Sequence, residues 1–157
     1  MNPNEPRMEY GKPLLIAGLR RHFAAPSNAI AEQWTQFAHY LGNIPGQVGG
    51  VAYGLCFPQS KGLDYLSGVE VSSIDSAPPE LAWTMIPAQK YAVFSHNEHV
   101  SKLLETLDAI QHDWLPSSGH TAAEGASGAP CFFERYGEKF DPKTGMGDIE
   151  VWVPIKS

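Results

Sequence analysis

The same order of secondary structure occurs twice along this chain. In each half, alternating apolar residues indicate strands, and apolar residues at three- to four-residue spacing indicate a helix. The expected elements are strand 14–23, helix 26–41 and strands 51–57 and 63–73, followed by strand 90–96, helix 97–115 and strands 131–137 and 147–155. We therefore predict an α+β fold of tandem duplicated β-α-β-β units, with an antiparallel sheet and pseudo-twofold symmetry.

The boundary between the halves is the Pro- and Ser-rich segment 73–80, "SIDSAPPE". We expect a first half at 1–74 and a second half at 79–157, which together form one domain of 157 residues. "GVEV" in the first half corresponds to "DIEV" in the second, so Glu70 and Glu150 take matching positions. A groove is expected where the two halves meet.

Composition argues against several classes of partner. The formal net charge is -6, and phosphate binding needs clustered Lys and Arg, so direct nucleic-acid binding is not expected. The sequence has no apolar run of membrane-spanning length and no signal peptide at its start, which predicts a cytoplasmic protein without a membrane partner. Cys56 and Cys131 are interpreted as reduced, buried thiols. His96 and His99 do not match a zinc pattern, so neither a metal nor a cofactor is predicted.

The last strand poses a question about Glu150. Ile149, Val151 and Val153 share one face, and Glu150 and Trp152 lie on the other. If that second face is exposed to solvent, Glu150 is an ordinary surface carboxylate and Trp152 is an isolated exposed ring. If it lines a cleft, Glu150 is a negative charge among apolar groups. From these residues alone the two alternatives are about equally supported.

The strand at 131–137 offers a second carboxylate. Phe132, Glu134 and Tyr136 share one strand face, and we expect this face to lie beside Glu150 and Trp152. Aromatic faces and a partly desolvated carboxylate attract a cation. The expected ligand-binding residues are Glu150, Trp152, Glu134, Tyr136 and Phe132, with Tyr53 and Phe57 from the first half and Trp83 from the junction.

Structural roles for these residues stay open. Glu134 could pair with Arg135 or Lys139, or accept a hydrogen bond from Tyr136. Trp83 could belong to the core. Glu70 is interpreted as a surface residue or a relic of the repeat. Trp34 and Trp114 fall in the apolar stripes of the two helices and are assigned to the core.

Four motifs in order, "IPAQKYAVFSH", "WLPSSG", "FFERYGEKFD" and "IEVWVPIK", resemble the gyrase-inhibitor-like (GyrI-like) family. That family includes the effector-binding domains of AraC-type and other drug-responsive bacterial regulators. The resemblance implies a tandem β-α-β-β fold whose central pocket takes hydrophobic, often cationic, drug-like molecules beside an acidic residue. No helix-turn-helix segment precedes the domain in this sequence, so a stand-alone form is expected, and the loop at 117–130 is long for the family.

The expected function is binding of a small hydrophobic or cationic ligand, without a cofactor. Two alternatives use the same fold. One is a hydrolase that opens strained rings of toxic compounds with a pocket glutamate, and the other is an interaction protein of the gyrase-inhibitor type. We favour the binding module because no acid–base or nucleophile pair has a diagnostic spacing. A homodimer is left open.

Overall fold

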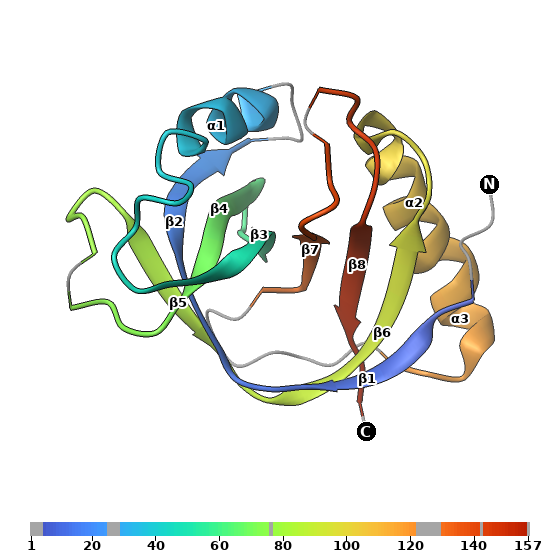
Figure 1. The fold of residues 1–157 in the computed structure, drawn as a ribbon. Helices are drawn as coiled ribbons and strands as arrows, with labels where there is room; N and C mark the ends of the chain where they lie inside the picture. The colour runs from blue at the N-terminus through green and yellow to red at the C-terminus, as the bar shows by residue number, and fades with distance from the viewer. Residues whose placement is uncertain (1–4, 25–28, 76, 122–129, 142, 157) are drawn as a thin grey trace.

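The computed structural model describes residues 5–24, 29–75, 77–121, 130–141 and 143–156. The expected helix-start signals at 26–28 and most of the loop at 117–130 lie outside these ranges. Within them the chain forms one eight-stranded antiparallel sheet and a few helices, which confirms the predicted α+β class. Figure 1 shows the sheet strongly curled, with α1 beside the strands of the first half and α2 beside β6 and β8.

Eight strands make up the sheet. They are β1 (Arg7–Gly11), β2 (Leu14–Phe23), β3 (Gln47–Pro58), β4 (Leu63–Val71), β5 (Ala82–Ile86), β6 (Gln89–His96), β7 (Phe132–Tyr136) and β8 (Ile149–Pro154). Their order across the sheet is β1-β6-β8-β7-β3-β4-β2-β5. If β1 is exchanged with β5, β2 with β6, β3 with β7 and β4 with β8, the order becomes β5-β2-β4-β3-β7-β8-β6-β1. This is the original order in reverse. β3 and β7 meet at the centre, where the two halves pair.

The second helical segment is longer than the sequence suggested. A 3-10 turn (Val100–Lys102) leads into α2 (Leu103–Ala109), a π-helical turn (Ile110–Trp114) and α3 (Leu115–Ser118). We expected the helix to end at residue 115, before Pro116, and this is wrong, because Pro116 lies in the first turn of α3, where its missing N–H is not needed. Gly119 ends the segment instead, with φ of 80°. No helix among the described residues is both long and apolar enough to cross a membrane.

Both faces of the sheet are buried. One face, here called the helix face, packs against α1 (Ala29–Phe37) and α2. Ala17 of the sheet and Phe37 of α1 belong to one buried apolar cluster, and Val151 of the sheet and Leu103 of α2 belong to another. The opposite face, here called the cavity face, carries a second apolar cluster that includes Leu55, Phe133 and, at its margin, Trp152. A one-residue shift in strand pairing would exchange these faces, so the register decides which site residues can meet.

Candidate functional site

The pairing of β7 with β8 separates the two predicted carboxylates. Phe133 lies opposite Trp152, and Arg135 lies opposite Glu150. Directly opposed residues point to the same side of a sheet, and neighbours along a strand alternate. Glu134 therefore points to the helix face, whereas Glu150 and Trp152 point to the cavity face. The expectation that Glu134 shares a face with Glu150 and Trp152 is therefore wrong, because the strands pair one residue away from the register that it needs. Phe132 and Tyr136 lie on the same face as Glu134, so the expectation is wrong for them too.

Glu134 is buried on the helix face and held by two tyrosines. Its Oε1 atom accepts hydrogen bonds from the hydroxyl of Tyr65 at 2.6 Å and from that of Tyr136 at 2.7 Å. The indole N–H of Trp34 donates in turn to the Tyr65 hydroxyl at 3.1 Å. Of the structural alternatives for Glu134, the bond from Tyr136 is present, whereas Arg135 pairs with Glu150.

Aromatic rings surround this carboxylate. The Trp34 ring meets those of Tyr136 and Tyr65 edge-on, with centroid distances of 5.3 and 6.3 Å. Phe140 packs against Tyr136 at 5.0 Å. Trp34 lies on α1 and is half-buried. These five residues, Trp34, Tyr65, Glu134, Tyr136 and Phe140, are called the Glu134 cluster.

Burial controls the ionisation of the cluster. It raises the pKa of the Glu134 carboxyl above its ordinary value, and the hydrogen bonds from Tyr65 and Tyr136 oppose this rise. The pKa values of both tyrosines are raised well above the ordinary value by burial and by the charge of Glu134. Among the described residues no cationic side chain forms an ion pair with Glu134. The cluster therefore contains a carboxylate whose charge is met only by neutral donors.

A glycine creates the space for this arrangement. Gly54 in β3 lies opposite Glu134 in β7. A Cβ atom at position 54 would collide with the Tyr65 hydroxyl and would lie 2.8 Å from Glu134 Oε1. The absence of a side chain at Gly54 thus allows the tyrosine and the carboxylate to meet over the central strand pair.

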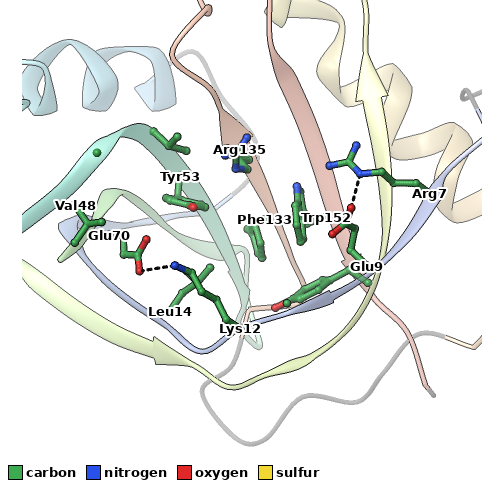
Figure 2. Close-up of a pocket in the computed structure, with 14 residues that line it drawn as sticks. Arg7, Glu9, Lys12, Leu14, Val48, Tyr53, Glu70, Phe133, Arg135 and Trp152 are labelled. Carbon is green, nitrogen blue, oxygen red and sulfur yellow. Dashed lines mark hydrogen bonds and ion pairs between the residues drawn. The ribbon is translucent and has the colours of Figure 1, made fainter. Parts of the chain in front are cut away.

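The cavity face holds an open cavity of about 480 Å³. Figure 2 shows Tyr53, Phe133 and Trp152 on one side of it and charged residues from the N-terminal segment on the other. Fourteen residues line the cavity: Arg7, Glu9, Gly11, Lys12, Leu14, Val48, Gly49, Val51, Tyr53, Glu70, Tyr91, Phe133, Arg135 and Trp152.

Carboxylates in and beside this cavity are paired with cations. Lys12 Nζ lies 3.5 Å from Glu70, which lines the cavity although the sequence suggested a surface position. Arg7 contacts Glu9 at 2.8 Å and Glu150 at 2.9 Å. Glu150 also lies 3.6 Å from Arg135 and accepts a 3.0 Å hydrogen bond from the Trp152 indole. The cavity therefore offers aromatic surface, but its negative charges are already compensated by the protein.

The other predicted site residues are dispersed. Phe57 is buried on the cavity face beneath the guanidinium of Arg20, which is 4.1 Å from the ring centroid. Trp83 lies on β5, at the edge of the sheet, and is 55% exposed. Neither residue lines the cavity. The sequence analysis did not select Tyr65 as a site residue, and it assigned Trp34 to the core. Both residues come close to Glu134 only because β3 pairs with β7, and this pairing cannot be recognised from the sequence of either strand.

The chain was compared with known proteins. A family model described as the GyrI-like small molecule binding domain matches residues 4–156. The transcriptional regulator BrlR of Pseudomonas aeruginosa is 29% identical over 143 residues, which cover 89% of this chain and 51% of BrlR. The chain thus spans about half the length of that relative.

Solved structures agree in fold. SAV2435 bound to tetraphenylphosphonium has a TM-score of 0.75 at 21% identity, and the match covers 98% of this chain and 94% of SAV2435. The C-terminal domain of EcmrR has a TM-score of 0.71 at 13% identity, with 96% of both chains covered. The family model spans nearly the whole sequence, as the four motifs predicted, and the chain belongs to the GyrI-like small molecule binding domain family.

Proposed function

We propose that this protein binds a small hydrophobic cation on the helix face, against the Glu134 carboxylate. The observation that carries the proposal is the burial of Glu134 among aromatic rings without a cationic partner in the described residues. An ionised carboxylate in such a place costs several kcal/mol unless a charge compensates it. A ligand cation supplies that charge and removes a cost that the empty protein carries.

The surrounding rings suit the same ligand. The faces of Tyr65 and Tyr136, against which Trp34 packs, offer cation–π contacts and apolar area to a compact aromatic cation. The Trp34 indole packs edge-on against both tyrosines, so binding on their faces requires its side chain to rotate outward from α1. The ligand's own ring then takes the place of the indole beside Tyr136, and one hydrogen bond, from Trp34 to Tyr65, is lost. The backbone of α1 stays in place, since buried Gln33 bonds to Leu19 O and Tyr65 O.

The relatives support this class of ligand. The structural neighbour SAV2435 holds tetraphenylphosphonium, a lipophilic cation, and the relative BrlR is a transcriptional regulator. The paired charges of the cavity argue against Glu150 as the selective group in the wild-type protein. Ligand binding by Trp152 and Tyr53 on the cavity face stays a prediction, and the Arg7→Gln variant tests it.

We also infer that residues 1–74 and 79–157 are duplicated β-α-β-β units, related by a pseudo-twofold axis within one domain. The strand order supports this inference, because exchanging each strand with the one four places away in the chain reverses the series. The expected match of Glu70 with Glu150 is wrong, because Glu70 is the eighth of the nine residues of β4, whereas Glu150 is the second of the six residues of β8. The proposed site would then lie on the axis, where β3 meets β7.

Isothermal titration with two ions of the same shape tests the proposed site. Tetraphenylphosphonium and tetraphenylborate differ in the sign of their charge. Glu134→Gln keeps the size of the side chain and is expected to weaken binding of the phosphonium by about 1 to 3 kcal/mol. The borate is expected to bind this variant no more weakly than wild type.

Glu150→Gln on the opposite face is the matched control and is expected to leave phosphonium affinity unchanged. The reverse result, with Glu150→Gln weakened and Glu134→Gln unaffected, would place the site in the cavity. Mass spectrometry of strained-ring compounds after incubation separates binding from hydrolysis, because Glu134-dependent turnover would make the protein an enzyme.

A further inference from the structure

The two cysteines, distant in sequence, are neighbours in the sheet. Cys56 in β3 lies opposite Phe132, the first residue of β7. The backbone N–H of Cys131 donates to the Cys56 carbonyl at 3.0 Å, and the Cys131 sulfur lies 3.5 Å from the same oxygen. Cys131 thus directly precedes the strand partner of Cys56 and is itself joined to Cys56 through the backbone.

The backbone contact brings the two cysteines side by side across the β3–β7 pair. The two thiols are close enough to shift each other's pKa. A disulfide requires Cα atoms about 4.4 to 6.8 Å apart, and residues joined by a direct backbone hydrogen bond between neighbouring strands lie at about this spacing.

The thiols differ in accessibility and acidity. Cys56 is buried as expected, but the expectation is wrong for Cys131, which is exposed at the residue just before β7. The neighbouring Cys56 thiol lowers the pKa of Cys131, and the neighbouring Cys131 thiol together with burial raises the pKa of Cys56. Because the thiolate is the nucleophile, Cys131 is suited to react first and Cys56 to react second.

We propose that Cys131 and Cys56 are a redox-active pair that forms a reversible intramolecular disulfide by exchange with a small-molecule disulfide such as oxidised glutathione. In the first step the Cys131 thiolate attacks one sulfur of glutathione disulfide, and one glutathione thiolate leaves. In the second step Cys56 loses its proton and attacks the Cys131 sulfur, and the second glutathione leaves. Two protein thiols are oxidised and one glutathione disulfide is reduced to two thiols, so electrons and atoms balance.

This disulfide would join the halves covalently. Cys56 belongs to the first half and Cys131 to the second, and the bond would cross the central β3–β7 pair. The inference does not depend on cation binding at Glu134, because its atoms and its chemistry are separate from that proposal.

The test exposes the reduced full-length protein to glutathione buffers of increasing oxidised fraction. Samples are quenched with N-ethylmaleimide and weighed intact by mass spectrometry. The expected product is a monomer two hydrogens lighter, which takes no maleimide and returns to the dithiol with dithiothreitol. Two stable glutathione adducts, two maleimide adducts at every ratio, or mainly disulfide-linked dimers would each overturn the proposal.

Two variants check the order of attack. Cys56→Ser is expected to stop at the mixed disulfide, with one glutathione on Cys131, and Cys131→Ser is expected to stay unmodified under the same conditions. Faster glutathionylation of Cys131→Ser than of Cys56→Ser would contradict the assignment of Cys131 as the attacking thiol. Thermal unfolding of both variants shows that the reactions are measured on folded protein.

Discussion

The Tyr65 hydroxyl donates a 2.6 Å hydrogen bond to Glu134 across 69 residues of sequence. Tyr65 lies on β4 of the first half and Glu134 on β7 of the second, with β3 between them. The contact passes over Gly54 of β3, the strand that pairs with both. The proposed site is therefore assembled from both halves, and neither half alone contains the carboxylate together with all of its donors.

The stability of the protein should depend on pH through Glu134. Burial raises the pKa of this carboxyl above its ordinary value, so the folded state holds the proton more tightly than the unfolded state. The stabilising contribution of the protonated form is complete below the ordinary pKa and is lost as pH rises through the folded-state pKa. Urea unfolding should show Glu134→Gln gaining stability relative to wild type over this window. A constant difference at all pH values would contradict the raised pKa.

Trp34→Leu should strengthen binding of tetraphenylphosphonium. The wild-type indole must leave Tyr65 and Tyr136 before the ligand can occupy their faces, and leucine removes that requirement. Isothermal titration measures the change. The control, Trp114→Leu, alters a ring that packs on Phe94 away from the site, and it should leave affinity unchanged. Weaker binding by Trp34→Leu would instead show that the indole stacks on the ligand.

Gly54→Ala should destabilise the fold by about 1 to 3 kcal/mol, the usual cost of overpacking. The added methyl group would collide with the Tyr65 hydroxyl and crowd Glu134, and both groups are fixed by hydrogen bonds. Gly50→Ala in the same strand is the control. Its nearest neighbour is the flexible end of Glu138 at 3.3 Å, which can shift. Chemical denaturation compares the two variants, and equal losses would contradict the steric argument.

Arg7→Gln tests the cavity face. This change removes the 2.9 Å ion pair with Glu150, and because Arg7 is largely exposed it should cost less than about 1 kcal/mol of stability. Glu150 then keeps only the longer 3.6 Å pair with Arg135 and the hydrogen bond from Trp152, so it should bind benzyltrimethylammonium more tightly than in wild type, as followed by indole fluorescence. The double variant Arg7→Gln/Glu150→Gln should lose this gain. Equal affinity for all three proteins would remove Glu150 from consideration as a cation site.

Much of the fold could be predicted because its signals are local. Alternation in "IEVWVPI" and helical spacing from Val100 to Trp114 depend on neighbouring residues alone, and both elements are present. The strand Arg7–Gly11 was missed, since Met8 and Tyr10 are exposed on a sheet edge and give no burial pattern. That omission matters, because Arg7 neutralises Glu150.

The site was harder to predict because it depends on pairing between distant strands. The alternation within 131–137 correctly grouped Phe132, Glu134 and Tyr136. Which face of β8 they accompany depends on the register, and a register one residue different would have placed Glu134 beside Trp152. Tyr65 on β4 and Trp34 on α1 are near Glu134 because of the order of the strands in the sheet. That order cannot be predicted from any one segment of the sequence.

The outer strands β1 and β5 are exchanged between the halves. β1 precedes β2 in the chain but pairs with β6, and β5 precedes β6 but pairs with β2. Cutting the chain in the segment 73–80 would therefore leave each fragment with its partner's edge strand and with an unpaired edge of its own. We expect neither fragment to fold alone, and we expect the two to complement each other when mixed. Unfolding should accordingly be a single cooperative transition for the entire chain, whatever the evolutionary history of its two parts.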